Sequence, residues 1–186
     1  MALPAPALLS VEEYFRFEEP SKEKHEYYDG HLIAMAGASM VHSKIQSNLI
    51  IALGNGFKKI QKNCTPLSSD ARAYVSDTRY FYPDVSVVCG DATMDEHNNL
   101  QKVEAIIEIL SPSTESFDRN EKALAYKAMP GLLQLILVNS VQPEVIIANR
   151  IEPDSWQEKR IIDEKVSFQI SEVDLSFDDI YDGIDF

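Results

Sequence analysis

Glu108 stands out among the charged residues because its surroundings are apolar. It lies in the stretch Ala105–Leu110, which reads AIIEIL. A strand with two apolar faces is typical of a buried sheet interior, and an isolated carboxylate there is unfavourable unless it is paired or binds a metal ion. We therefore expect Glu108 to be a metal ligand or a catalytic group. A buried ion pair or a protonated carboxyl is the alternative.

Asp84 is a second candidate because it follows a proline in an aromatic and β-branched stretch, 80–88. Proline has no N–H to donate to a β-ladder, so Pro83 marks the start, the edge or a bulge of a strand. Asp84 then lies where the strand is redirected, unless it is an ordinary turn residue. A polar segment separates Asp84 from Glu108, so we expect neighbouring strands to bring the two carboxylates together.

A lysine on the following helix, predicted over 116–129, completes the candidate set. Lys122 and Tyr126 are spaced at i and i+4 and therefore share one side of this helix. Lys122 borders the apolar stripe, so we expect it at the edge of the packed face. A surface ion pair with Asp118 is the alternative. Lys127 is the competing candidate for the lysine of the site, although it lies about 140° further round the helix than Lys122.

Together these residues form an ordered set with two earlier ones. Glu26 lies in the sequence Glu-Tyr-Tyr-Asp-Gly (26–30), and His42 lies near the start of a helix that opens at Ser39. From about Val11 to Val138, the set resembles the Uma-type family of predicted endonucleases. That family belongs to the PD-(D/E)XK superfamily, which has the restriction-endonuclease-like fold. The resemblance rests on Glu26, His42, Pro83-Asp84, the segment Glu108–Thr114, Asp118, Lys122 and Tyr126.

The resemblance implies a metal-dependent endonuclease that hydrolyses phosphodiester bonds in nucleic acid, with DNA as the expected substrate. Asp84 and Glu108 would hold Mg²⁺ or Mn²⁺, with the backbone carbonyl of Ile109 as a further ligand. Carboxylate oxygens and water suit Mg²⁺, which polarises the scissile phosphate and helps to form hydroxide. Lys122 would stabilise developing negative charge or orient the water.

Three other residues are expected around this centre. Glu26 is an additional ligand or a neighbour that supports the ligands, with an exposed strand position as the alternative. His42 is expected to support the site or the fold rather than to act as the base. Tyr126 either contacts phosphate or packs in the core.

Two departures from the superfamily pattern leave room for a different function. Leu110 stands where the Glu-x-Lys signature has lysine, so the resemblance assigns that role to Lys122. The stretch 134–139 lacks the aromatic residues and the final Asp that the family usually has there. This difference indicates divergence at the strand and in oligomer contacts. The alternative function is a catalytically inactive nuclease-fold module that binds or scaffolds.

The composition supports a folded domain with an acidic surface. The 186 residues are 45% hydrophobic and 25% charged, which suffices for a core and excludes overall disorder. The net charge is −13, and the segment 151–186 has 3 basic and 11 acidic residues. Such a chain does not coat nucleic acid through bulk attraction, which favours the alternative function. We expect one nuclease-like domain over 1–186, with its core at about 39–150 and an acidic C-terminal hairpin extension over 151–186.

The cysteines and the apolar stretches bear on location and partners. Cys64 and Cys89 show no metal or redox spacing, so we expect two reduced thiols in a cytoplasmic protein, with a disulfide as the alternative. The apolar stretches are far shorter than the roughly 20 residues of a membrane span, so we expect no membrane contact. Sequence specificity is expected to need dimerisation or a partner, and a homodimer is the expected assembly.

The fold expected to position these residues is of the α/β (α+β) class. It is a restriction-endonuclease-like mixed central β-sheet flanked by helices, with an N-terminal helix and a β-hairpin. A capping box of Ser10 and Glu13 predicts the first helix over 10–19, and Asp29-Gly30 predicts the hairpin turn. The other predicted elements are a helix that opens at Ser39, strands at 71–75, 80–88, 103–110, 132–139 and 144–149, a mobile polar connection over 91–102, the helix over 116–129, and a final hairpin of 156–162 with 165–170.

Overall fold

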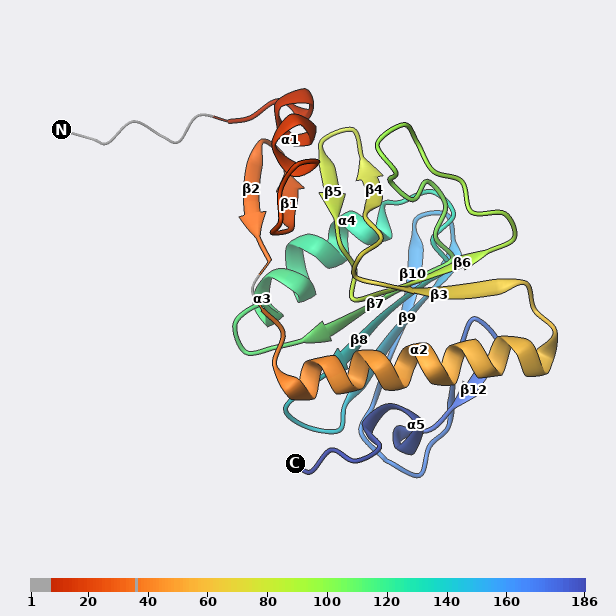
Figure 1. Cartoon of the computed structure of the whole chain (residues 1–186). Coiled ribbons are helices and arrows are strands. Elements are labelled where there is room, and N and C mark those ends of the chain that lie inside the picture. Colours follow the sequence, from red (N-terminus) through yellow and green to blue (C-terminus); the bar gives the residue numbers. More distant parts are fainter. Residues whose placement is uncertain (1–7, 36) are drawn as a thin grey trace.

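Two β-sheets and the crossing between them organise the chain. The computed structural model describes residues 8–35 and 37–186. The larger sheet has six strands in the order β10 (Ser155–Ile161), β9 (Val145–Glu152), β8 (Gln134–Asn139), β7 (Ala105–Leu110), β6 (Val85–Cys89) and β3 (Cys64–Ser68). β7 and β8 are parallel and the other neighbours are antiparallel. The sheet is therefore mixed, as expected (Figure 1).

The smaller sheet and the first helix form the N-terminal end of the fold. The smaller sheet has four strands in the order β2 (His31–Ala34), β1 (His25–Tyr28), β5 (Arg79–Phe81) and β4 (Ala73–Ser76). The predicted hairpin turn is confirmed, since Asp29 and Gly30 have φ angles of 46° and 95°, the positive values that a tight two-residue turn requires. The first helix is confirmed as α1 (Val11–Glu18), with the capping box of Ser10 and Glu13 in place.

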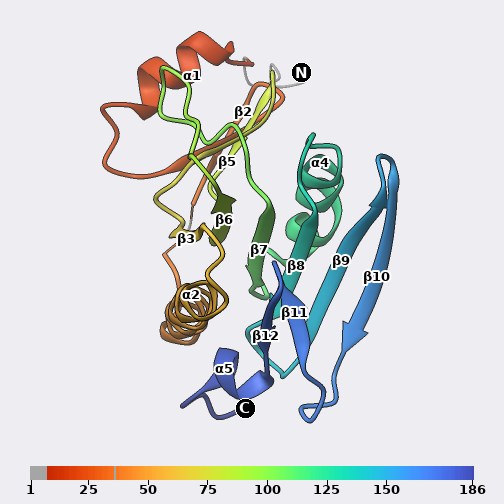
Figure 2. The same ribbon diagram turned by 90° about the vertical axis from the view of Figure 1, so that its right-hand side faces the viewer.

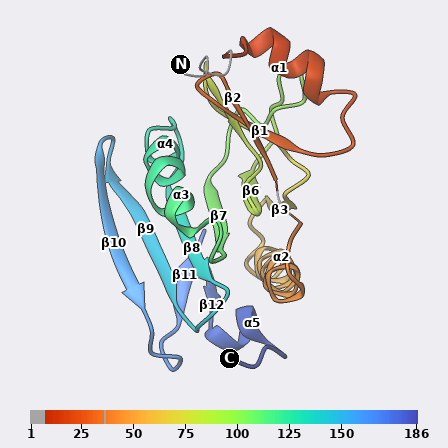
Figure 3. The same ribbon diagram turned by 90° about the vertical axis from the view of Figure 1, so that its left-hand side faces the viewer.

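Helices cover both faces of the six-stranded sheet. α2 (Met40–Ile60) begins after its predicted cap, Ser39, and packs on one face. On the other face lie α3 (Glu115–Phe117), η1 (Asp118–Lys122) and α4 (Ala123–Lys127), as the two side views show (Figure 2, Figure 3). Alternate residues of β7 point to opposite faces, so Ile107 packs on the α2 side and Ile106 on the α4 side. Glu108 therefore points toward α4.

The helix predicted over 116–129 is not one regular α-helix. η1 is a π-helical turn between two α-helical segments, and such turns are rare and often occur at functional sites. A π turn changes which side chains share a face, so the spacing of 3.6 residues does not describe the surroundings of Lys122. The side chain was expected at the edge of the packed face, but the residue is only 4% exposed.

The stretch predicted as one strand over 80–88 forms two strands in different sheets, and the break lies at Pro83 and Asp84, where the sequence indicated that the strand is redirected. β5 and β6 belong to different sheets, and Tyr82, Pro83 and Asp84 form the crossing between them. Pro83 has no N–H to donate. The N–H groups on either side of it face carboxylates instead of a ladder, with Tyr82 N 2.9 Å from Glu26 Oε1 and Asp84 N 3.4 Å from Glu108 Oε2. Contacts with distant side chains therefore end the strand.

The C-terminal part pairs differently from the prediction. β10 was expected in a final hairpin with the next strand, but it pairs with β9. The last hairpin is instead β11 (Phe168–Ile170) with β12 (Val173–Leu175), followed by α5 (Phe177–Tyr181). Neither α5 nor β3 was predicted. Side chains of β11, β12 and α5 lie in the same apolar core as those of α2, so this acidic segment also completes the core.

The polar connection over 91–102 is tied to the fold, which corrects the expectation of a mobile loop. Leu100 is fully buried, and its N–H donates to the carbonyl of Arg72 at 2.7 Å. The Asp95 carboxylate accepts hydrogen bonds from both the backbone and the side-chain amide of Asn99. One apolar anchor and one acidic side chain thus order a segment whose composition looks like a loop.

Two findings bear on the expected location. Cys64 and Cys89 form a disulfide, so the expectation of two free thiols was wrong. The antiparallel register of β3 and β6 places the two residues directly opposite, with their Cα atoms 4.0 Å apart. A cytoplasmic location therefore has no support from free thiols. None of the helices in the described part of the chain combines the length and hydrophobicity that crossing a membrane requires.

Reduction of the Cys64–Cys89 disulfide should lower the melting temperature. The bond links residues 25 positions apart, and chain entropy predicts about 3 kcal/mol of stabilisation for a loop of this length. In a chain of this size, that corresponds to a fall of about 5–10 °C. Calorimetry with and without a reductant measures the shift. The double variant Cys64→Ser/Cys89→Ser should show no shift when the reductant is added. A wild type whose melting temperature is the same with and without the reductant would contradict the prediction.

Candidate active site

The register of β6 and β7 brings Asp84 next to Glu108. Val85 and Ile107 are paired across these strands, and Asp84 and Glu108 occupy the next position. Asp84 Oδ2 accepts a hydrogen bond from the N–H of Ile109 at 2.7 Å. Asp84 is 8% exposed and Glu108 is 3% exposed. Asp84 and Glu108, which were predicted to meet, therefore lie side by side in the interior of the fold.

Lys122 lies at the centre of a buried acidic cluster. Its Nζ is 2.8 Å from Glu108 Oε1, 2.9 Å from Glu26 Oε1 and 3.7 Å from Asp118 Oδ1. Burial alone lowers the pKa of this ammonium, but the charges of Glu108 and Glu26 outweigh burial and raise the pKa above its ordinary value. Lys122 therefore stays positively charged and links β1, β7 and η1.

Glu26 reaches the site from the smaller sheet. It belongs to β1 and is 4% exposed, so the alternative of an exposed strand residue does not apply. Its Oε1 accepts hydrogen bonds from the N–H of Tyr82 at 2.9 Å and from Lys122 Nζ at 2.9 Å. One carboxylate thereby holds both the crossing backbone and the lysine, and it helps to fix how the two sheets meet.

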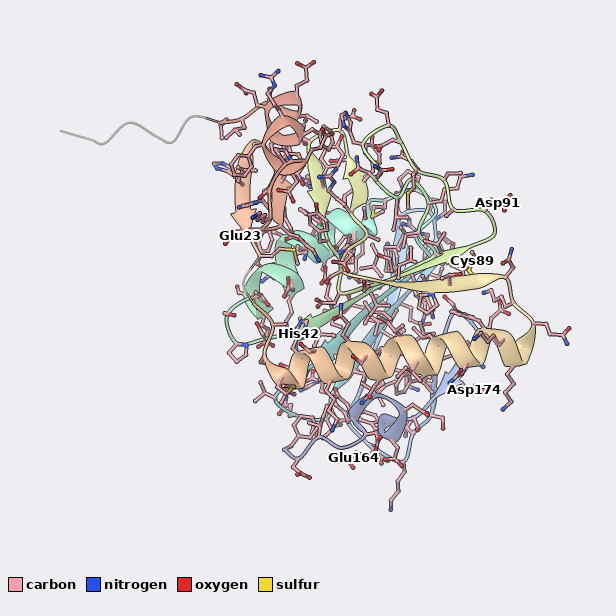
Figure 4. All side chains as sticks on the ribbon, viewed as in Figure 1. Glu23, His42, Cys89, Asp91, Glu164 and Asp174 are labelled. Carbon is pink, nitrogen blue, oxygen red and sulfur yellow. A yellow bond between two sulfur atoms is a disulfide. The ribbon has the colours of Figure 1, made fainter. Side chains whose placement is uncertain are left out.

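Tyr126 and His42 each hold one of the two central carboxylates. The hydroxyl of Tyr126, fully buried, donates to Glu108 Oε1 at 2.6 Å. Burial first, and then the charge of Glu108, raise the pKa of Tyr126. His42 lies in the first turn of α2 (Figure 4), with Nε2 3.2 Å from Asp84 Oδ2. Burial is the largest single effect and lowers the pKa of His42, but the hydrogen bond and the charge of Asp84, together with the charge of Asp118, outweigh burial, so the net pKa is raised.

Asp118 is the member of the cluster that sequence reasoning misplaced. Its spacing from Lys122 indicated an ion pair, but at the surface. The structure buries Asp118 to 6% exposure, and burial raises the pKa of its carboxyl although Lys122 acts in the opposite direction. The spacing was the available signal for the pair. The burial follows from the π turn and from the contact of this turn with the sheet, which no local pattern reveals.

The charges of the cluster fit a divalent cation. The ammonium of Lys122 contacts three buried carboxyl groups, those of Glu26, Glu108 and Asp118, and the buried carboxyl group of Asp84 lies next to Glu108. Among the described residues, none donates a hydrogen bond to Asp84 Oδ1, so this oxygen is available to an ion. No three acidic or histidine side chains of the described cluster place their ligand atoms within 4.8 Å of one another, so the protein offers few direct ligands. Mg²⁺ is commonly held by one or two carboxylates and several waters, so such a donor set suits it. The carbonyl of Ile109 as a further ligand stays a prediction.

Comparison with known proteins assigns the chain to a family. A family model described as "Uma2: Putative restriction endonuclease" matches residues 11–177. The chain belongs to the Uma2 family. Two Synechocystis relatives, "Uncharacterized protein slr1290" and "Uncharacterized protein sll1609", are 34% and 27% identical to it. These matches cover 96% and 92% of this chain and 94% and 97% of the relatives. Uma2 membership confirms the resemblance and supports a nuclease function.

A solved structure shares the fold of this Uma2 chain. It is the crystal structure of "a putative nuclease belonging to DUF820" from Anabaena variabilis. The TM-score is 0.76 at 19% sequence identity, over 92% of this chain and 97% of that chain. The likeness confirms the fold class, a restriction-endonuclease-like mixed sheet flanked by helices.

Removal of the buried ammonium should destabilise the fold. Lys122→Met leaves Glu26 and Glu108 buried without their cation, which typically lowers the free energy of unfolding by about 3–5 kcal/mol. Urea unfolding at neutral pH measures the loss. Lys127→Met is the matched control, because Lys127 pairs with the exposed Glu158, and such pairs contribute about 1 kcal/mol or less. Equal losses in the two variants would contradict a stabilising role for the buried pair.

Stability should fall as the pH rises because of Glu108. Burial is the main cause that raises its pKa from the ordinary 4.5 to about 8. Between these values the native state binds a proton that the unfolded chain has lost, so the free energy of unfolding falls by up to about 1.4 kcal/mol per pH unit. The raised pKa of His42 acts in the same direction. Urea unfolding measured between these pH values should show that the free energy of unfolding falls less steeply with pH in Glu108→Gln than in the wild type. A wild-type free energy that does not change with pH would refute the prediction.

Proposed function

We propose that the chain is a metal-dependent endonuclease that hydrolyses phosphodiester bonds in DNA, with Mg²⁺ or Mn²⁺ as its ion. The observation that carries the proposal is the convergence of Asp84, Glu108 and Lys122 at one buried point. Burial of several carboxylates is unfavourable for folding, and perturbed acidic groups of this kind cluster at functional sites. The family description, "Putative restriction endonuclease", supports the same activity.

The residues proposed to hold the ion are Asp84 and Glu108, with the carbonyl of Ile109 as a further ligand. A bound divalent ion would supply the positive charge that polarises the scissile phosphate and favours deprotonation of the attacking water. Tyr126 and His42 keep the two carboxylates oriented, through contacts of 2.6 Å to Glu108 and 3.2 Å to Asp84. These supporting side chains reduce the rearrangement that ion binding would otherwise need.

Lys122 is proposed to stabilise the negative charge that develops on the phosphate. An ammonium group has three N–H donors, and two acceptors here are Glu26 and Glu108. The surrounding carboxylates keep Lys122 protonated, so it provides positive charge and does not act as a base. Its burial lowers the local dielectric constant, which strengthens its interaction with a developing anion.

The alternative function is an inactive nuclease-fold module that binds or scaffolds. The net charge of −13 favours it, because it opposes non-specific attraction to DNA. Leu110 at the position of the signature lysine favours it too, but Lys122 reaches Glu108 at 2.8 Å from another element and can take that role. The homodimer expected from the sequence is part of our proposal, and sedimentation at several protein concentrations tests it separately.

Plasmid cleavage tests the proposed activity. The wild type should nick supercoiled DNA with Mg²⁺ or Mn²⁺ and should not do so with EDTA. Asp84→Asn, Glu108→Gln and Lys122→Met should each slow cleavage by about 10²-fold or more, as expected for the loss of one group that stabilises charge in the transition state. Glu158→Gln is the matched control, because its carboxylate is exposed and lies outside the cluster, so this variant should cut like the wild type.

Thermal shifts separate ion binding from cleavage. Mg²⁺ should raise the melting temperature of the wild type, as does any ligand that binds only the native state, and Glu108→Gln should lose this rise. A wild type that binds the ion without cutting DNA would instead support the binding module. Normal cleavage by Glu108→Gln would show that the reaction uses other residues.

A further inference from the structure

A second cluster of ligand-type side chains lies at the other end of the six-stranded sheet. Cys64 opens β3, Cys89 closes β6, and Glu104 directly precedes β7. Asp84, by contrast, directly precedes β6 at its opposite end, and Figure 4 shows Cys89 and His42 toward opposite ends of α2. This helix has 21 residues and is therefore about 30 Å long. The second cluster is separate from the candidate active site.

The ligand atoms of this second cluster are already close together. The two sulfur atoms and one carboxylate oxygen of Glu104 lie within 4.8 Å of one another, and the three residues are half-buried. The backbone of Glu104 is fixed on both sides, since its N–H donates to Val87 and its carbonyl accepts from Leu133, each at 2.8 Å. The fixed main chain of Glu104 thus places this residue beside the cysteines, with a carboxylate oxygen close to both sulfur atoms.

We propose that Cys64, Cys89 and Glu104 bind Zn²⁺ when the disulfide is reduced. Thiolate sulfur and carboxylate oxygen are both ordinary zinc ligands, and three protein ligands with one water complete a tetrahedral site. The proposal does not depend on the nuclease function, because none of these three residues belongs to the acidic cluster around Lys122.

The local charges favour a divalent cation in the reduced state. Once the two thiols have released their protons, as zinc binding requires, the thiolates and the Glu104 carboxylate carry three negative charges, against one positive charge on Lys62, whose Nζ is 2.8 Å from Glu104 Oε1. Repulsion among three neighbouring anions is relieved when a cation binds between them. Lys62 also contacts Glu172 Oε1 at 3.0 Å, so it keeps a partner when Glu104 turns toward the ion.

The disulfide and the zinc site are two states of one cysteine pair. In the structure the two sulfur atoms are bonded to each other. Starting from the zinc form, glutathione disulfide can oxidise the pair. The two thiolates lose two electrons and form the S–S bond, while glutathione disulfide takes up these electrons, its own S–S bond breaks, and it leaves as two glutathione thiolates. Zn²⁺ departs with its charge unchanged, so zinc occupancy follows the thiol redox state.

Cobalt titration of the whole chain tests the site. The protein is reduced with a phosphine, freed of reductant without oxygen, and titrated with Co²⁺, whose thiolate complexes have charge-transfer absorption. We expect one thiolate-bound Co²⁺ per chain, displaced by Zn²⁺ and lost after oxidation with glutathione disulfide. Co²⁺ held by the carboxylates of the candidate active site gives no such absorption. The absence of thiolate absorption in the reduced wild type would overturn the proposal.

Variants assign the ligands. Cys64→Ser should lose the tight thiolate-bound ion, and Glu104→Gln should weaken Zn²⁺ binding by about 10-fold or more. Asp91→Asn is the matched control, because Asp91 is an exposed carboxylate near Cys89 that lies outside the set (Figure 4), and it should bind like the wild type. If circular dichroism shows that Cys64→Ser does not fold, the oxidised wild type replaces it, because its two sulfur atoms are bonded to each other and cannot act as thiolate ligands. Equal Zn²⁺ affinity in Glu104→Gln and the wild type would remove Glu104 from the site and overturn the proposal.

Discussion

The ion pairs of buried Lys122 are the interaction on which the rest of the structure depends. This one ammonium joins Glu26 of the smaller sheet, Glu108 of the larger sheet and Asp118 of the π turn. Any of these groups alone would be strongly unfavourable in the interior, and their burial is tolerable because they compensate one another. Charge compensation, together with apolar packing, therefore sets where the two sheets and the covering helix meet.

The same carboxylates determine the path of the backbone between the sheets. Pro83 interrupts the row of N–H donors, and the N–H groups of Tyr82 and Asp84 face Glu26 and Glu108 instead of another strand. The chain leaves one sheet at this point and enters the other, which places Asp84 beside Glu108. The excess of negative charge opposes folding and favours a bound cation. Such a conflict between local stability and chemistry is what a functional site is expected to show.

The two ends of the six-stranded sheet present different donor atoms. Near the start of α2, Asp84 and Glu108 offer oxygen, which suits a hard ion such as Mg²⁺. Near the end of α2, Cys64 and Cys89 would offer sulfur with one carboxylate when their disulfide is reduced, which suits zinc. β6 connects the two ends, since it begins after Asp84 and closes with Cys89. One rigid strand thus separates two clusters whose ligand types would keep their ions distinct.

The sequence by itself determined what depends on neighbouring residues, and the tertiary structure decided what depends on distant ones. The capping box at Ser10, the turn at Asp29-Gly30 and the apolar setting of Glu108 have local causes, so they could be predicted. The pairing of β10 with β9 and the disulfide depend on strand register, and the burial of Lys122 depends on a π turn that shifts the helical spacing. Periodicity describes one element at a time, whereas register joins two and the compensation of buried charge involves several. The carboxylates could therefore be named from the sequence. Only the fold could show that Lys122 is buried among them and makes their burial tolerable.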